Sequence, residues 1–198
     1  LEDFVEAHAN STLRSVAGRR WVRTYCPNAR FTLKVDPGVV VNTVPLLNYL
    51  AQLSDSNVTR PALVRENTFL CKAHTNVTVN RQQSAAYPIS REQFAADVYP
   101  TFCEGCAYMF TTDLAGKLAD LSENVREFVF EDVYLTGMLA TKLNASYVRL
   151  GRNYTSTDPS NAKYAAANFS IDYTLFVHTT GLNEFSYTWN RIYDKIKD

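Results

Sequence analysis

The sequence lacks both a long apolar run and an excess of charge of one sign. No stretch approaches the roughly 20 consecutive apolar residues that a transmembrane helix needs. Lys plus Arg and Asp plus Glu each total 20, so the formal net charge is zero. A chain with this balance has no long-range field that would attract nucleic acid or an anionic membrane surface. We therefore expect no nucleic-acid partner.

Internal repeats, low-complexity linkers and a secretory leader are also missing. The first residue is Leu1, and no positively charged, apolar leader precedes the rest of the chain. We expect the chain to be a processed or trimmed piece of a protein whose signal or membrane anchor lies outside it. Its 198 residues suit one domain, and a hydrophobic content of 46% provides for a globular core.

Cysteine is scarce but even in number, with four residues at positions 26, 71, 103 and 106. In an oxidising compartment this number predicts two disulfides, for which three connectivities are possible. Cys103 and Cys106 also have the spacing of a zinc-ligand pair or a redox dithiol. Zinc would need a second close pair of ligands, and Cys26 and Cys71 do not form one. We therefore favour structural disulfides.

Sequons for N-glycosylation are abundant by comparison. The pattern Asn-x-Ser/Thr occurs six times among fifteen asparagines, which is more often than chance predicts. A sequence rich in Ser, Thr and Asn can produce such matches by accident, but six favour a lumenal or secreted protein whose surface accepts glycans. The six asparagines are Asn10, Asn57, Asn76, Asn144, Asn153 and Asn168.

Helical and strand patterns alternate along the chain. Helices are predicted at residues 12–25, 44–53, 111–121, 131–143 and 181–196. Strands or short apolar runs are predicted at residues 31–35, 39–41, 61–70, 76–80, 107–110, 128–130, 145–150 and 173–177. The polar or irregular stretches at 82–98 and 152–168 are expected at the surface. This alternation predicts an α/β domain in which helices cover a sheet.

The segment from residue 99 to residue 138 holds the strongest chemical signal. A Cys/Gly-rich loop and a predicted helix are followed by the apolar residues 128–130 and the acidic pair Glu131 and Asp132, where another helix begins. A buried strand that ends in two carboxylates at a helix start can place a catalytic base, because the helix dipole favours the ionised form. Acidic residues at helix starts are common, so the spacing alone favours a simple helix cap.

Three stretches resemble the β-1,3-galactosyltransferase and N-acetylglucosaminyltransferase family of inverting, UDP-sugar-dependent enzymes. Residues 99–138 (YPTFCEGCAY, a helix, EDVYLTG) resemble the pattern YPPYCSGxGY, a helix, EDVYxG. Residues 3–36 resemble DFxDxYxNLTLKTxxGLxWVxxxCPxAxFxLKxDDDxFVN, and residues 177–189 resemble a strand-His-x-x-x-Pro-Glu helix that ends in Trp. The resemblance implies one domain over residues 1–198, N-terminally incomplete, of the GT-A, Rossmann-like type with a mixed sheet flanked by helices.

The resemblance also implies roles for individual residues. Asp132 would be the base that takes a proton from the acceptor hydroxyl, and Glu131 would support it. Lys34 and Asp36 would belong to the nucleotide site. Asp36 and His178 would bind the manganese or magnesium that offsets charge on the diphosphate. Without the resemblance, a hydrogen-bonded histidine at a strand end is the better interpretation of His178.

The substrate loop of the family is only partly matched. Gly105 and Tyr108 agree with the pattern, whereas Glu104 and Ala107 stand where Ser and Gly are typical. Tyr87 falls in the place of a family aromatic residue and could present its ring to a sugar. A tyrosine in this setting is equally typical of surface or packing roles.

The largest departure from the family concerns the metal motif. The family has Asp-x-Asp after Lys-x, but here Lys34 and Val35 are followed by Asp36, Pro37 and Gly38. The aspartate that coordinates the metal in the family is therefore replaced by Gly38, which has no side-chain ligand. Asp36 could contact a ribose or a metal-bound water, or it could open a type II turn before Pro-Gly. The sequence favours neither interpretation of Asp36.

On this resemblance we expect a hexosyltransferase of the Golgi lumen, as part of a type II membrane protein, or a secreted one. It would transfer galactose or N-acetylglucosamine from a UDP-sugar to a glycan of a glycoprotein or glycolipid, in β-1,3 linkage and with inversion. The altered metal motif keeps a second interpretation open. In that interpretation the chain is a catalytically silent relative that binds glycan or a partner transferase.

Overall fold

The computed structural model describes residues 10–54, 64–82, 84, 87–151, 155–156 and 170–197. The helices are α1 (Ser11–Tyr25), α2 (Thr43–Ser54), α3 (Asp113–Ser122), α4 (Glu131–Val133), the π-helical η2 (Tyr134–Leu139), α5 (Ala140–Lys142) and α7 (Leu182–Lys197). The strands are β1 (Phe31–Val35), β2 (Val39–Val41), β3 (Thr68–Cys71), β4 (Ala73–His74), β5 (Phe102–Cys103), β6 (Ala107–Thr111), β7 (Ser146–Arg149), β8 (Thr155–Ser156) and β9 (Phe176–His178).

A four-stranded mixed sheet in the order β1-β6-β3-β7 forms the centre of the molecule. β6 pairs antiparallel with β1 and β3, and β3 pairs parallel with β7. All five residues of β6 are buried, because this inner strand is covered on both faces. Successive side chains of a strand point to opposite faces, and Tyr108 and Phe110 accordingly join one core cluster while Met109 joins another.

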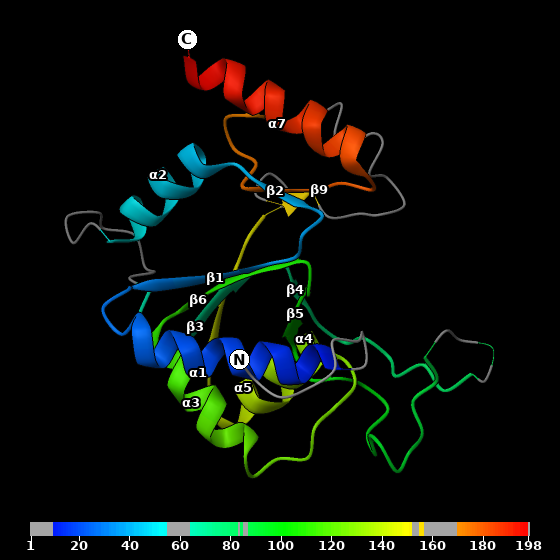
Figure 1. Cartoon of the computed structure of the whole chain (residues 1–198). Helices are drawn as coiled ribbons and strands as arrows, with labels where there is room; N and C mark the ends of the chain where they lie inside the picture. The colour runs from blue at the N-terminus through cyan, green and yellow to red at the C-terminus, as the bar shows by residue number, and fades with distance from the viewer. Residues whose placement is uncertain are drawn as a thin grey trace.

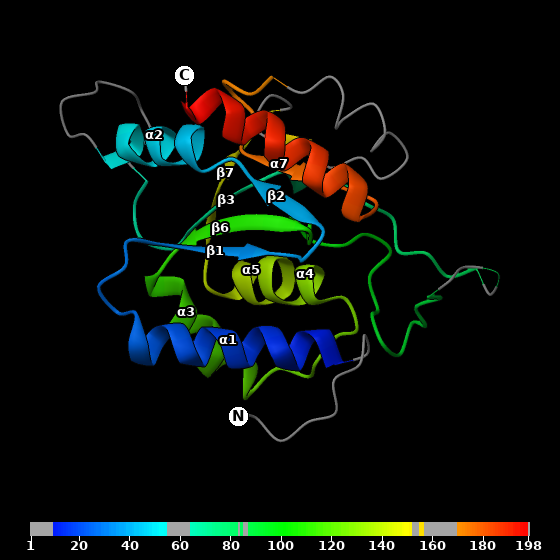
Figure 2. The ribbon, with the colours of Figure 1, turned by 45° about the horizontal axis from the view of Figure 1, so that its top comes forward.

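Helices lie on both sides of this sheet. Figure 2 shows α1, α3, α4 and α5 below β1 and β6, with α2 and α7 above them. The upper side also holds the small sheet β2-β9-β8, on which α7 packs through Ile192 (Figure 1). The prediction of an α/β domain with a mixed sheet flanked by helices is confirmed.

Most predicted elements are present, but the strand predicted at residues 128–130 is wrong. These residues have no ladder partner, and the carbonyl of Phe128 instead accepts a hydrogen bond from Thr12 Oγ1 at 2.8 Å. Residues 76–80 form only an isolated bridge, between Thr78 and Val98. The helix predicted from Glu131 is continuous, but its middle is π-helical, a feature that is frequent near functional sites.

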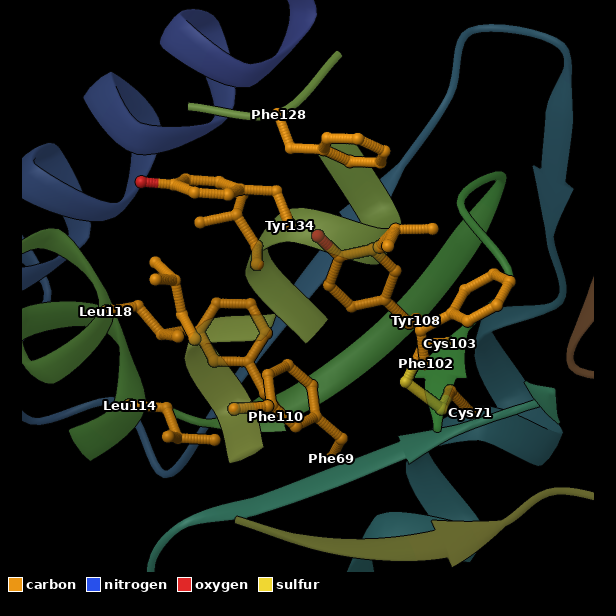
Figure 3. Close-up of a cluster of buried hydrophobic side chains, with 14 of the residues drawn as sticks. Phe69, Cys71, Phe102, Cys103, Tyr108, Phe110, Leu114, Leu118, Phe128 and Tyr134 are labelled. Carbon is orange, nitrogen blue, oxygen red and sulfur yellow. A yellow bond between two sulfur atoms is a disulfide. The ribbon is translucent and has the colours of Figure 1, made fainter. Parts of the chain in front are cut away.

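The prediction of two disulfides is half right. Cys71 and Cys103 form a disulfide that joins β3 to β5 within the core (Figure 3). Cys26 and Cys106 are free. They lie beyond opposite ends of the β1–β6 ladder, and this ladder is five residues, or roughly 15 Å, long. A disulfide needs its two Cα atoms within about 7 Å of each other. The pairing of Cys103 also excludes a dithiol or zinc role for Cys103 and Cys106 together.

The predicted glycosylation sites fall in different environments. Asn76 and Asn144 are exposed, and Asn10 is half-buried. Asn57, Asn153 and Asn168 lie outside the described residues. Glycosylation therefore stays a prediction, which the exposure of two of these side chains favours. Within the part of the chain that the structure describes, no helix has the length and apolar character needed to cross a bilayer.

Candidate active site

A cleft of about 900 Å³ lies between α1, β1, the loop before β6 and the start of α4. The start of α4 contributes Glu131 and Asp132, and the loop contributes Gly105. Sequence segments that are far apart therefore meet here. The charged residues that line the cleft are Arg14, Arg19, Lys34, Asp36, Glu104, Glu131 and Asp132.

Asp132 lies half-buried in the wall of this cleft. Its Oδ1 accepts a hydrogen bond from the backbone N–H of Val133 at 2.8 Å, which fixes the carboxylate at the start of the helix. Burial raises the pKa of Asp132, and the negative charge of Glu131 adds to the rise, while the Val133 hydrogen bond and Lys34 oppose it. A carboxylate whose pKa is raised towards neutral is a better general base than an exposed one.

Gly105 packs directly against the Asp132 carboxylate. A Cβ atom added at Gly105 would lie 3.0 Å from Asp132 Oδ2 and 3.3 Å from Asp132 Cγ. Any side chain at this position would therefore displace the carboxylate or the loop. Agreement with the family pattern at Gly105 thus has a steric reason in this structure.

Glu131 is buried and held by three neighbours. Tyr108 donates its hydroxyl proton to Glu131 Oε1 at 2.6 Å. The same Oε1 lies 3.8 Å from the Arg19 guanidinium, and Oε2 lies 3.7 Å from Lys34 Nζ. Tyr108 is fully buried in the core, in the same hydrophobic cluster as Phe102 and Tyr134 (Figure 3). Glu131 is thus fixed in place next to Asp132, and its negative charge contributes to the raised pKa of Asp132.

Lys34 links β1 to the loop before β6. Its ammonium group lies 2.7 Å from Asp36 Oδ1 and also donates to the carbonyl of Gly105. The two residues predicted for the nucleotide site, Lys34 and Asp36, are therefore paired with each other. This pairing joins the turn after β1 to the loop that contacts Asp132.

Asp36 opens a turn, as one of the two interpretations left open by the sequence expects, but the turn is not of type II. The N–H of Val39 donates to the carbonyl of Asp36 at 3.0 Å. A type II turn requires a positive φ at its third residue, which is Gly38, and none of the described glycines has one. The backbone therefore does not require glycine at position 38. A Cβ there would lie 3.8 Å from His178 Nε2 and 3.3 Å from the carbonyl oxygen of Thr179.

The residues assigned to a metal do not fit a resident divalent ion. His178 lies at the carboxyl end of β9, and its buried Nδ1 has no hydrogen-bond partner among the described residues. Asp36 is paired with the cationic Lys34, which disfavours a second cation. No group of three or more His, Cys, Asp or Glu side chains within the described ranges is arranged to hold a metal. We therefore derive no step through a metal.

Two further residues lie at or near the cleft. Tyr87 is exposed, and its ring meets the Phe130 ring edge-on with centroids 6.1 Å apart. Because Phe130 lines the cleft, Tyr87 lies at its margin. Cys106 also lines the cleft, but burial and the nearby Glu104 and Asp36 raise the pKa of its thiol to about 12. The thiol therefore stays protonated and is a poor nucleophile.

Comparison with known proteins assigns the family. The profile of the galactosyltransferase family matches residues 1–151. The chain belongs to the galactosyltransferase family. It is 31% identical over 136 residues to UDP-GalNAc:beta-1,3-N-acetylgalactosaminyltransferase 1 of Rattus norvegicus, covering 68% of this chain and 38% of that one. It is also 31% identical over 143 residues to human beta-1,3-galactosyltransferase 2, covering 72% and 32% of the two chains.

The galactosyltransferase assignment agrees with the predicted GT-A type of domain. The chain spans about a third of the length of these relatives. A solved glycosyltransferase involved in the glycosylation of the major capsid of PBCV-1 aligns with 96% of this chain and 81% of its own, at 15% identity and a TM-score of 0.44. The α/β fold rests on the element arrangement described above, independently of that likeness.

Two buried residues of this galactosyltransferase domain were missed from the sequence. The hydroxyl of Thr136 donates to the carbonyl of Asp132 at 2.6 Å and accepts from the N–H of Cys103 at 2.8 Å, so it joins the helix that begins with α4 to β5. Arg19 reaches Glu131 through Tyr108. Its position on the buried face of α1, with Thr12 and Val16, is the signal in the sequence that could have pointed to it.

Proposed function

We propose that this domain is an inverting hexosyltransferase that transfers galactose or N-acetylglucosamine from a UDP-sugar to a glycan in β-1,3 linkage. The observation that carries this proposal is the Asp132 carboxylate, half-buried in a cleft and held by Val133 and Gly105. Family membership supplies the reaction class. The names of the relatives add UDP-N-acetylgalactosamine to the donors that should be tested.

The proposed reaction needs a base that removes the proton of the acceptor hydroxyl, and we assign this role to Asp132. The acceptor oxygen forms a bond to the anomeric carbon as the bond from that carbon to the UDP oxygen breaks, with UDP leaving on the opposite face. Asp132 takes the proton of the acceptor hydroxyl, so the oxygen attacks without a developing positive charge. The neighbouring carboxylate of Glu131 raises the pKa of Asp132, which favours uptake of the proton.

The remaining residues of the cleft position the substrates. We propose that Tyr87 presents an apolar ring face to the acceptor sugar at the margin of the cleft. The family resemblance assigns Lys34 and Asp36 to the nucleotide end of the cleft. Of the family's metal ligands the chain keeps His178 and Asp36, and Asp36 is paired with Lys34. We therefore expect manganese to strengthen UDP binding by less than about tenfold.

Replacing Gly105 by alanine is expected to reduce transfer by about 10²-fold, because the new Cβ meets Asp132 Oδ2 at 3.0 Å and a displaced base loses its alignment. The initial rate of UDP release with saturating acceptor measures this. Gly181→Ala is the matched control, since its Cβ would meet nothing within 4 Å. Equal rates for the two variants would show that the contact between Gly105 and Asp132 is not needed.

The alternative, a catalytically silent relative that binds glycan or a partner transferase, is favoured by Gly38 in the metal motif. Calorimetric titration of the full-length protein with UDP separates the two proposals. The transferase is expected to bind UDP with and without manganese. No heat of binding under either condition, even at millimolar UDP, would favour the silent relative.

We also propose that the domain works in the Golgi lumen or outside the cell. The six sequons and the Cys71–Cys103 disulfide favour an oxidising compartment. The acceptor would be a glycan on a glycoprotein or glycolipid. Sensitivity of the protein's electrophoretic mobility to an N-glycosidase, after expression in a eukaryotic secretory pathway, tests this location.

A further inference from the structure

Arg19 is a buried cation that the described fold retains in its core. Its side chain is 4% exposed, and its guanidinium lies over the rings of Tyr108 and Phe110 at 5.8 and 5.2 Å. The family pattern GLxWV, matched by residues 18–22, has leucine at this position. A buried ion is costly to desolvate, and replacing such an ion by an apolar side chain is often neutral or stabilising. Stability alone therefore gives little reason for arginine at position 19.

Arg19 is anchored on its own helix at one side and reaches the acidic pair at the other. Its Nη1 donates to the carbonyl of Ser15 at 2.8 Å, which anchors the side chain on α1. Its Nη2 donates to the hydroxyl oxygen of Tyr108 at 2.5 Å and lies 3.8 Å from Glu131 Oε1. Because the Tyr108 oxygen accepts from Arg19, its proton is directed to Glu131, which it reaches at 2.6 Å.

We propose that Arg19 is a positioning residue for the candidate base: with Tyr108 it fixes Glu131, and thereby the start of α4 that holds Asp132. The kinetic test of this inference rests on the proposed transferase function. The NMR test of the geometry around Glu131 and Asp132 does not depend on that function. Burial keeps the pKa of Tyr108 well above its usual value, so Tyr108 remains a neutral donor in this chain of contacts. Lys34 contacts Glu131 from the opposite side, through the other carboxylate oxygen.

The kinetic test compares Arg19→Leu with Arg20→Leu. Arg20 is the matched control because it is the next residue of α1 but is exposed and contacts Glu123 outside the cleft. Arg19→Leu is expected to lower kcat about tenfold or more with little change in the KM for the UDP-sugar, and Arg20→Leu to change neither. Arg19→Lys, which keeps the charge, is expected to recover part of the loss.

A second measurement decides the inference even if no transfer is detected. The Val133 amide, which donates to Asp132, serves as an NMR reporter of the geometry at the base. Arg19→Leu is expected to shift its resonance and to reduce its protection from hydrogen exchange about tenfold relative to amides of β6. Arg20→Leu should leave both unchanged.

Tyr108→Phe tests the same chain of contacts without replacing Arg19. It removes the hydroxyl between Arg19 and Glu131 but keeps the buried ring, so it should change the Val133 amide in the same direction. The inference is overturned if Arg19→Leu and Tyr108→Phe both match Arg20→Leu at the Val133 amide. A loss of transfer without a change at that amide would also overturn it. Absence of transfer in the wild type, together with the expected amide changes, would count against the proposed function alone.

Discussion

Replacing Asp132 by asparagine is expected to reduce sugar transfer by about 10²- to 10⁴-fold, the usual contribution of a general base. Asparagine keeps the shape of the side chain and can still accept the Val133 hydrogen bond, but it cannot take a proton from the acceptor. Transfer by the wild type should also fall as the pH is lowered through the raised pKa of Asp132. Initial rates of UDP release across a pH series measure both effects.

The stability of Asp132→Asn to urea distinguishes the loss of a base from damage to the fold. Because the pKa of Asp132 is raised in the folded protein, the folded state binds the proton more tightly than the unfolded state. The contribution of Asp132 to stability is therefore fully present below the pKa of the unfolded state and is lost as the pH rises through the raised folded pKa. Asp132→Asn should then be more stable than the wild type to urea at neutral pH, although it is less active.

Asp120→Asn is the control for this substitution. Asp120 is an exposed aspartate on α3 that pairs with Arg23, outside the cleft. It should retain the wild-type rate and gain no stability. If Asp132→Asn kept the wild-type rate, Asp132 could not be the base.

Replacing Gly38 by aspartate is expected to make UDP binding depend on manganese, with a gain of about 10- to 100-fold in affinity when the metal is added. The new carboxylate would start from a Cβ atom 3.8 Å from His178 Nε2 and would supply an oxygen ligand beside that histidine, where the existing Asp36 is already paired with Lys34. Gly38 has no positive φ, so the backbone tolerates a side chain. The carbonyl of Thr179, at 3.3 Å, would need to move by a few tenths of an ångström.

Gly38→Ala isolates the effect of the carboxylate, because it adds the same Cβ atom without a ligand. Calorimetric titrations with UDP, in manganese and in a chelator, should give the same affinity for Gly38→Ala under both conditions. Adding His178→Ala to Gly38→Asp should remove most of the gain. If the UDP affinity of Gly38→Asp were as insensitive to manganese as that of Gly38→Ala, a carboxylate at position 38 would not form a metal site with His178.

Local patterns were sufficient to predict the elements that hold the site. The alternation at residues 31–35 predicts β1 with its observed bounds, and the acidic pair at Glu131 marks the start of a helix that is present. The aromatic residues at 128–130 mislead because their spacing is typical of a strand. A side chain, Thr12 Oγ1, satisfies the Phe128 carbonyl in place of a neighbouring strand, and no local pattern reveals such a contact.

Long-range contacts account for what the sequence could not predict in the site. Arg19 and Tyr108 are 89 residues apart, so an arginine on the buried face of a helix gives no indication of its partner. The Asp-Pro-Gly sequence is typical of a type II turn. The carbonyl of Gly38, however, accepts hydrogen bonds from Thr179, which follows β9 and lies 141 residues further along the chain. The free state of Cys26 and Cys106 likewise depends on the β1–β6 register.

The most direct test of the proposed function is a transfer assay with the full-length wild-type protein. UDP-galactose, UDP-N-acetylglucosamine and UDP-N-acetylgalactosamine would each be supplied with β-linked galactose and N-acetylglucosamine acceptors, and products would be characterised by NMR. We expect one donor to give a β-1,3-linked product, with its anomeric configuration inverted from that of the donor, and Asp132→Asn to give none in the same time. Absence of product from every donor, in protein that is folded and binds glycan, would contradict the account.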